Sequence, residues 1–284
     1  RFGDRSIVTK IKSHVHPFVL RREKSEVLDD LPEKVIQTHI CALSDDQKAI
    51  YQSVLQQARG SLRDRIGGAD RGIPYLHIFS ALNSLKQICN HPAVYFRNRG
   101  QTAQRHEYDC DKWDLFCYLL SEALASGQKV VVFSQYLAML DLIEEYLHAH
   151  NIGYTSVRGN TRQRGERVEK FQTDPDCRVF VASLHAAGVG IDLTAGSVVI
   201  LYDRWWNAAK ENQAIDRVHR IGQSKGVQVI RLIVQGTIEE KIDAIIERKA
   251  KLMKEAVVTD DHRFLKSLSE DEILALLDFN HEET

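Results

Sequence analysis

The chain has 284 residues, 43% of them hydrophobic, and its 38 Lys and Arg nearly balance its 39 Asp and Glu, giving a formal net charge of −1. This length and composition predict a globular protein with one sizeable core plus a helical appendage, or two small domains. Five cysteines without a Cys-x-x-Cys pair, and histidines without zinc spacing, indicate neither a disulfide framework nor a metal site. No apolar run approaches the ~20 residues of a membrane span, so we expect no membrane partner.

Charge is distributed unevenly along the chain. Residues 158–170 carry more bases than acids, namely Arg158, Arg162, Arg164, Arg167 and Lys170 against Glu166 and Glu169. Residues 260–284 are the reverse, because acidic side chains dominate there. An anionic ligand therefore belongs near the first segment, and the acidic tail is a candidate docking site for a protein regulator. Since the chain begins with Arg1, we expect it to be a fragment of a longer protein.

The first third of the chain reads as helical. In order, it predicts a helix over 6–22 interrupted at Pro17, an extended segment over 35–43, a helix over 44–59 opened by a Ser44 and Gln47 capping box, a glycine-rich loop over 60–72, and a helix over 75–89. The Asn-His-Pro string at 90–92 is expected to end the last helix. For His91 a structural role is favoured over a ligand role, because nothing near it pairs for metal binding or catalysis.

From residue 111 onward the predicted elements alternate between helices and strands. Helices are expected at 111–125, 137–150, 163–171 and 208–220, and strands at 129–133, 154–157, 178–182, 198–201 and 227–234. The strands are short and rich in Val and Ile, as in parallel strands covered on both faces. A capping box at Thr237 opens a helix to about Val257, and a tail helix is expected at 269–279. The fold class is therefore α/β, with a parallel sheet, helices on both faces, an N-terminal helical extension and C-terminal helices.

Ligands of open parallel sheets bind at the carboxyl ends of the strands, so the loops there are candidate sites. After the first strand, Ser134 and Gln135 offer a hydroxyl and an amide to a phosphate oxygen, although a plain serine cap explains Ser134 equally well. In the next loop, Arg158 offers a guanidinium group, and Gly159 lets a ligand approach the backbone closely. Further on, Gly188-x-Gly190 lacks the third glycine of a dinucleotide fingerprint, so that reading is discarded.

Arg217 and Arg220 stand out in the helix expected over 208–220, which Gly222 stops. At a spacing of i and i+3, they would lie one turn apart and present two guanidinium groups to a single anion. The plain alternative is a solvated helix face on which Glu211 and Asp216 neutralise the arginines. A Trp-Trp-Asn turn before the helix favours a functional site, because large aromatics at a strand exit bury themselves or serve a ligand.

Several strings resemble motifs of the SWI/SNF family of DNA translocases. Residues 213–223, from Gln213 to Gln223, are similar to the family's sixth helicase motif, and residues 182–194 to its fifth. Residues 20–34 resemble the exit from the first ATPase lobe, and residues 85–92 are another family string. The fifth motif departs from the family at His185, where Lys or Arg is usual, and at Ala187, where Gly is common.

The resemblance implies the second RecA-like lobe of a DNA-dependent ATPase. By this similarity, residues 1–43 form the linker from a first lobe that the chain lacks, 44–108 a helical insertion packed on the second lobe, 109–257 the lobe itself and 258–284 an acidic helical tail. No Gly-x-x-x-x-Gly-Lys-Ser/Thr string occurs in the chain. ATP with Mg²⁺ would therefore be bound mainly by the first lobe, and we expect the isolated chain to be inactive in hydrolysis.

The resemblance also assigns roles to individual residues. Arg217 and Arg220 would be catalytic, as arginine fingers. Nucleotide contacts would come from Gly188, Gly190, Asp192 and Gln213. DNA contacts would come from Ser134, Gln135, Arg158, Gly159, Asn160, Ser183, Leu184, His185, Trp206 and Asn207. Trp206 is expected to be exposed as a minor-groove wedge, with Trp205 buried beside it.

The partners implied are double-stranded DNA and the first lobe of the same protein. The location implied is the cytoplasm of a bacterium or archaeon, beside the nucleoid, or the nucleus of a eukaryote. One alternative of a different class stays open: a RecA-like module that only binds nucleic acid or a protein. The two arginines favour the ATPase.

Overall fold

The computed structural model describes residues 31–66, 75–187, 190–252, 272 and 275–277. Its centre is one sheet in the order β1-β6-β5-β2-β4-β3, and each neighbouring pair is parallel. The strands are β1 (Lys34–Cys41), β2 (Val130–Ser134), β3 (Tyr154–Val157), β4 (Val179–Ser183), β5 (Val198–Leu201) and β6 (Val227–Val234). The predicted parallel α/β fold is confirmed.

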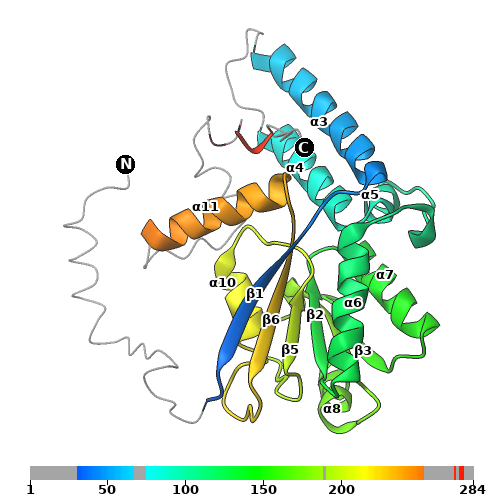
Figure 1. Cartoon of the computed structure of the whole chain (residues 1–284), viewed down its shortest axis with the longest axis vertical. Coiled ribbons are helices and arrows are strands. Elements are labelled where there is room, and N and C mark those ends of the chain that lie inside the picture. The colour runs from blue at the N-terminus through cyan, green and yellow to red at the C-terminus, as the bar shows by residue number, and fades with distance from the viewer. Residues whose placement is uncertain (1–30, 67–74, 188–189, 253–271, 273–274, 278–284) are drawn as a thin grey trace, which may run out of the picture.

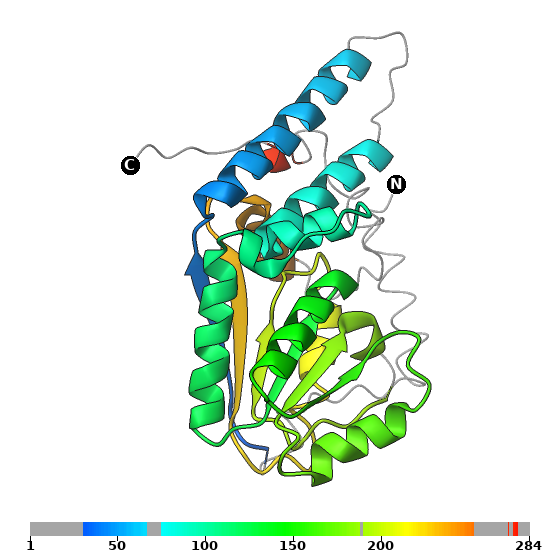
Figure 2. The same cartoon turned by 90° about the vertical axis from the view of Figure 1, so that its right-hand side faces the viewer.

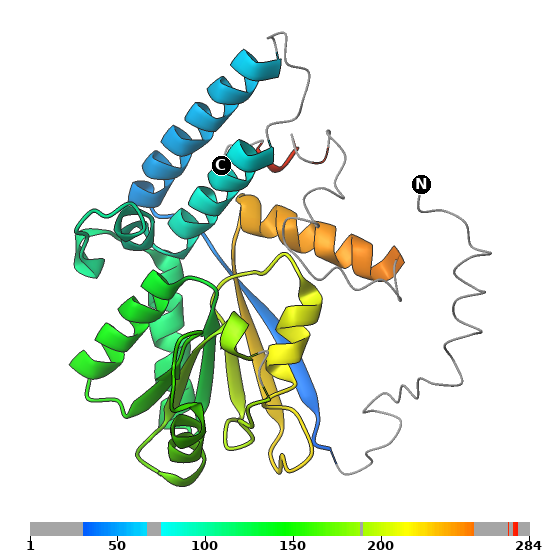
Figure 3. The same cartoon turned by 180° about the vertical axis from the view of Figure 1, so that it is seen from behind.

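Helices cover both faces of this sheet, as the views in Figures 1 and 3 show. They are α6 (Asp111–Ala125), α7 (Leu137–Ala149), α8 (Arg164–Thr173), α9 (Leu184–Ala187), α10 (Ala208–Ile215) and α11 (Ile238–Leu252). Alternate strand residues feed two cores, because successive side chains of a strand point to opposite faces. Val131 and Phe133 join a cluster with α8, α10 and α11, whereas Val130 and Val132 join a cluster with α6 and α7.

A helical layer lies beyond the carboxyl ends of the strands, above the sheet in Figures 1 and 2. It consists of α3 (Asp45–Ile66), α4 (Tyr75–Asn90), α5 (Pro92–Arg97) and the short 3₁₀ helix η2 (Arg105–Glu107). The predicted capping box at its start is confirmed: Gln47 N donates to Ser44 Oγ at 3.2 Å and Ser44 N to Gln47 Oε1 at 3.1 Å. The Gln47 amide also donates to Ile88 O at 2.8 Å and so ties α3 to α4.

Of three predicted elements next to this layer, two are confirmed and one differs from the structure. The extended segment predicted over 35–43 is confirmed: residues 34–41 form the edge strand β1 and pair with β6 along their full length. The first helix does not end at Gly60 but continues to Ile66, since its packing on α4 outweighs the ~1 kcal/mol cost of a glycine. The string at 90–92 ends α4 at Asn90, as predicted, and it also starts another helix, because His91 caps α5 and Pro92 occupies its first turn.

The end of the chain contacts this helical layer where it is described. Leu276 and Leu277 are 2% exposed and join the core cluster of α3, α4 and α11. Arg59 Nε donates to Leu277 O at 2.9 Å, and Arg248 of α11 pairs with Glu272. Other predictions lie outside the described residues: the helix over 6–22, the loop tip at 67–72, the last turn of the helix to Val257 and the rest of the tail helix over 269–279. Across the described ranges, no helix is both long and apolar enough to span a bilayer.

Candidate nucleotide and DNA site at the carboxyl edge of the sheet

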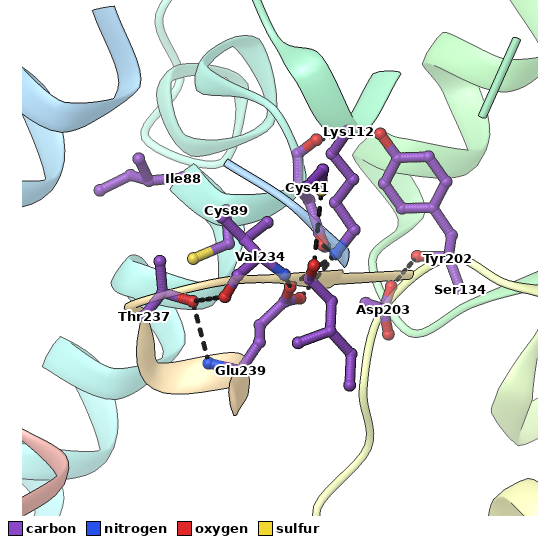
Figure 4. A network of polar contacts seen from close by, with 12 residues as sticks. Cys41, Ile88, Cys89, Lys112, Ser134, Tyr202, Asp203, Val234, Thr237 and Glu239 are labelled. Carbon is purple, nitrogen blue, oxygen red and sulfur yellow. Dashed lines mark hydrogen bonds and ion pairs between the residues drawn. The ribbon is translucent and has the colours of Figure 1, made fainter. Parts of the chain in front are cut away.

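A buried aspartate links two of the predicted loops. Asp203, just after β5, is 1% exposed, and its carboxylate accepts a short hydrogen bond from Ser134 Oγ. Gln135 donates to the same carboxylate twice, from its backbone N at 3.2 Å and from Nε2 at 2.9 Å. Figure 4 shows Ser134 and Asp203 facing each other across the strand ends. The loop after β2 is thereby fixed to the loop after β5.

The next residues form a buried ionic network with α10 and α11. Arg204 pairs with Glu211 of α10, and its Nε lies 2.6 Å from Asp243 Oδ1 of α11. Burial alone would lower the pKa of Arg204, but these two carboxylates outweigh it and raise that pKa above its usual value. Glu211 also accepts from Trp205 N at 2.8 Å. Glu211 therefore holds the Trp-Trp turn and does not neutralise Arg217 or Arg220 through these contacts.

Both tryptophans of the turn are buried. Trp205 is 1% exposed and Trp206 4%, and both belong to the core shared with α10 and α11. The Nζ of Lys86 lies 5.3 Å from the centroid of the Trp206 ring. The expectation that Trp206 is an exposed wedge is wrong, because the helical layer supplied by α4 covers it. The expectation that Trp205 is buried is confirmed.

The two arginines lie in turns after α10. The helix ends at Ile215 and not at Arg220, so the prediction of a shared helix face is wrong. Two carbonyls beyond the end of α10 accept hydrogen bonds from outside a helix: Leu193 N donates to Arg217 O at 2.9 Å, and Gln223 Nε2 donates to Val218 O at 3.1 Å. Both arginine side chains are half-buried.

Gln223 locks this segment to the loop before β5. It is 6% exposed, and the same Nε2 donates to Gly196 O at 2.8 Å. A Cβ at Gly196 would lie 2.8 Å from Val131 Cγ2, so glycine lets the loop approach the sheet. The arginine turn, the loop over 190–197 and β2 thus form one rigid unit.

The predicted nucleotide contacts lie along the loop that this unit fixes. Asp192 is half-buried, and its Oδ1 accepts from Thr194 N at 3.1 Å. Gly190 is exposed with a φ of +22°, and Gln213 is exposed on α10. Gly188 lies outside the described residues. The hydrogen bond between Leu193 and Arg217 brings the loop of Gly190 and Asp192 next to the arginine turn.

The ten predicted DNA contacts divide by burial. Ser134, Ser183, Leu184, Trp206 and Asn207 are buried, Gln135 and Arg158 are half-buried, and Gly159, Asn160 and His185 are exposed. Several of the buried groups have local tasks: Ser183 Oγ accepts from Ala186 N at 3.3 Å, and Asn207 caps α10 by accepting from Ala209 N at 3.0 Å. These buried residues contact DNA only if their main-chain atoms do so or if the loops rearrange locally. Their DNA-binding role stays a prediction.

The loop after β3 is open to solvent. Its Arg158 pairs with two carboxylates of α7, at 2.7 Å from Asp141 Oδ1 and 2.7 Å from Glu144 Oε1. Burial lowers the pKa of Arg158, but the hydrogen bonds to Glu144 and Asp141 raise it by more. A DNA phosphate would compete with these carboxylates for the guanidinium.

A second buried ion pair connects elements next to the carboxyl ends of the strands. Lys112 Nζ lies 2.7 Å from Glu239 Oε1, and both side chains are 0% exposed (Figure 4). Lys112 also donates to Asn90 Oδ1 at 3.2 Å, and Val234 N donates to Glu239 at 3.1 Å. The pair joins α4, α6 and the turn from β6 to α11. Over the described part of the chain, no three His, Cys, Asp or Glu side chains gather as a metal site.

Comparison with known families and proteins agrees with this geometry. Residues 111–222 match the helicase conserved C-terminal domain, and residues 3–94 match the SNF2-related domain. The C-terminal domain of the Sulfolobus solfataricus SWI2/SNF2 ATPase is 29% identical, with a TM-score of 0.69 over 87% of this chain and 100% of that one. The chain belongs to the SWI/SNF family. Its sheet and helices are the family's RecA-like lobe.

Two further relatives extend the match to almost the whole chain. The Sulfolobus solfataricus SWI2/SNF2 ATPase core in complex with double-stranded DNA is 32% identical, with a TM-score of 0.71 over 98% of this chain and 57% of that one. An uncharacterised ATP-dependent helicase of Mycoplasma genitalium is 36% identical over 95% of this SWI/SNF chain and 25% of its own length. The chain spans about a quarter of the length of the first curated relatives.

Sequence reasoning missed the buried charged residues of the site. Asp203, Glu211, Lys112 and Glu239 carry no recognisable spacing, because their partners lie 6 to 127 residues away. One signal was present for Asp203. A carboxylate directly after an apolar strand, at the edge where loops converge, is a candidate for organising those loops.

Proposed function

We propose that this SWI/SNF lobe is one half of an ATP-dependent translocase of double-stranded DNA. The lobe supplies Arg217 and Arg220 to the phosphates of an ATP molecule held by a first lobe, and it grips DNA with the loops after β2, β3 and β4. The observation that carries the proposal is the hydrogen bond from Leu193 N to Arg217 O. It joins the loop of Gly190 and Asp192 to the turn that bears the arginines.

The proposed role of Arg217 and Arg220 depends on the negative charge of the ATP phosphates. Phosphoryl transfer spreads negative charge over the transferred group, and guanidinium groups stabilise that charge without reorganisation. Asp192 would bind the ribose, with Gly190 and Gln213 close to the nucleotide. ATP with Mg²⁺ would be held mainly by the first lobe, since the sequence contains no Gly-x-x-x-x-Gly-Lys-Ser/Thr string.

The DNA side rests on the exposed end of the site. Asn160, Gly159 and His185 are accessible, and Gln135 is half-buried. Such groups contact phosphates and sugars and so position a duplex without reading its sequence. The relative of known structure that binds double-stranded DNA supports a duplex as the ligand. We place such a protein at chromosomal DNA, in a bacterial or archaeal cytoplasm or in a nucleus, with the acidic tail as the docking site of a regulator.

Joining this chain to a first lobe tests the function. The chain alone should hydrolyse no ATP, whereas the two-lobe protein should hydrolyse ATP faster when duplex DNA is added. The rate of phosphate release, with and without a duplex, measures both. Hydrolysis by the chain alone would contradict the division of the site between lobes. A two-lobe protein whose hydrolysis is indifferent to DNA would contradict the DNA role, and one that hydrolyses no ATP would support a plain binding module.

A further inference from the structure

The carboxylate of Asp203 has more donors from one loop than a simple cap requires. It accepts from Ser134 Oγ, from Gln135 N and from Gln135 Nε2, and it is 1% exposed. Hydrogen bonds to an ionised carboxylate are roughly twice as strong as neutral ones. Both the backbone and the side chain of Gln135 are therefore held by one charged group.

Ser134 and Gln135 differ in the hydrogen-bonding groups that they can offer to a ligand. Ser134 is 0% exposed, and its hydroxyl already donates to Asp203 and accepts from Tyr136 N at 3.2 Å. Gln135 is half-buried, and a carboxamide carries two N–H groups. One of them donates to Asp203. The other has no hydrogen-bond partner among the described residues and can donate to an anionic oxygen.

A carboxylate also selects the orientation of that amide. It accepts hydrogen bonds and donates none, so only the nitrogen end of the Gln135 amide suits it. Asp203 is itself fixed, because the next residues are held by Glu211: Arg204 pairs with it, and Trp205 N donates to it at 2.8 Å. The amide is thus oriented by a group that the rest of the core immobilises.

We propose that Asp203 is a positioning residue for DNA binding, which holds the Gln135 amide with one N–H directed to a phosphate of the duplex. The inference rests on the proposed DNA contact of Gln135. Asp203 touches no DNA and acts through Gln135 alone. Ser134 completes the support of the carboxylate but contributes no DNA contact.

A double-mutant cycle tests this role, with the dissociation constant of the chain for a short DNA duplex at low salt as the readout. Gln135→Ala and Asp203→Asn should each weaken binding about tenfold. The double variant should bind no more weakly than the weaker single variant, because both changes remove the same contact. A purely structural Asp203 would give effects that multiply, and that result overturns the proposal. Leu137→Ala, at a 55% exposed position just after this loop, is the control and should bind within about twofold of wild type.

The remaining outcomes distinguish a failure of the DNA contact of Gln135 from a failure of the positioning role of Asp203. If Gln135→Ala binds as tightly as wild type, or wild type fails to bind the duplex, the proposed DNA contact fails and the positioning role with it. If Gln135→Ala is weakened and Asp203→Asn is not, only the positioning role fails. Should Asp203→Asn not fold by thermal unfolding, Asp203→Glu replaces it. That variant keeps the charge but displaces the oxygens, and the same non-additive loss is expected.

Discussion

Two loops at the same edge of this sheet are built in opposite ways. The segment after β5, from Asp203 to Asn207, has no regular structure, yet all of it is buried and held by the carboxylates of Glu211 and Asp243. The loop after β3 is exposed at Gly159 and Asn160, and its Arg158 forms ion pairs that are partly open to water. Both strings look like ligand loops in the sequence.

The difference shows how this lobe divides its work. An irregular segment is buried only if its polar groups find partners, and the loop after β5 finds them in its own side chains and in α10. It acts as a scaffold. The loop after β3 keeps its groups accessible and is suited to contact a ligand. Substitutions in the first loop should therefore act on folding, or on binding through the residues that the loop holds, and substitutions in the second loop should act on binding directly.

The largest expected effect is on ATP turnover, which two substitutions should lower without changing DNA affinity. In a two-lobe protein, Arg217→Ala or Arg220→Ala should lower ATP turnover ~10³-fold or more while DNA affinity stays within about twofold, since arginine fingers act on the transition state. Turnover at saturating DNA and duplex binding measure the two. Lys225→Ala, an exposed residue just beyond the turn, is the matched control. A parallel loss of DNA binding would contradict the role.

Trp206→Ala tests the scaffold most directly. Truncating this buried ring should lower the free energy of unfolding by about 3–5 kcal/mol. Denaturant unfolding of the chain measures it, with Leu137→Ala, 55% exposed, as the apolar control expected to change little. A Trp206→Ala protein as stable as wild type would restore the idea of an exposed wedge.

An arginine–glutamate pair occurs in each loop, which permits a matched comparison. Glu211→Ala should cost about 3 kcal/mol, because it leaves Arg204, 3% exposed, without its nearest carboxylate. Glu144→Ala removes a partner of Arg158, whose side chain is 25% exposed, and should cost at most about 1 kcal/mol. The two values come from the same unfolding measurement. Equal costs would remove the distinction between the loops.

The same contrast of buried and exposed groups predicts a pH effect at His91. Burial, then the charges of Arg105 and Arg97, lower its pKa from 6.5 to about 3. The unfolded state therefore binds the proton first, so stability is full above about pH 6.5 and falls by about 1.4 kcal/mol per pH unit below it, down to about pH 3. In His91→Asn, which keeps a side-chain cap, this part of the slope should vanish. His106→Asn, at an exposed position, should keep the wild-type slope.

The smallest expected effect belongs to the open loop. Asn160→Ala should leave the free energy of unfolding within about 0.5 kcal/mol of wild type and weaken duplex binding by about two- to threefold. Fluorescence titration with a DNA duplex and denaturant unfolding provide the pair of values. A large loss of stability with unchanged DNA binding would reverse the assignment of the two loops.

The sequence by itself determined the architecture. Short Val- and Ile-rich runs between amphipathic segments predict a covered parallel sheet, and the structure has it, because burial on both faces imposes that pattern locally. The Ser44–Gln47 capping box was also readable, since its partners are three residues apart. The family followed from strings such as residues 213–223, whose order is local too.

Tertiary structure alone decided what the site residues do. Whether Trp206 is exposed depends on α4, more than a hundred residues earlier, and the arginine turn is held by Leu193 and Gln223, which donate to the carbonyls of Arg217 and Val218. Asp203 gains its role from Ser134, 69 residues away. Local patterns fix which faces are apolar. Hydrogen bonds between distant loops form only once the sheet has brought their ends together, so their pairing is absent from any short stretch of sequence.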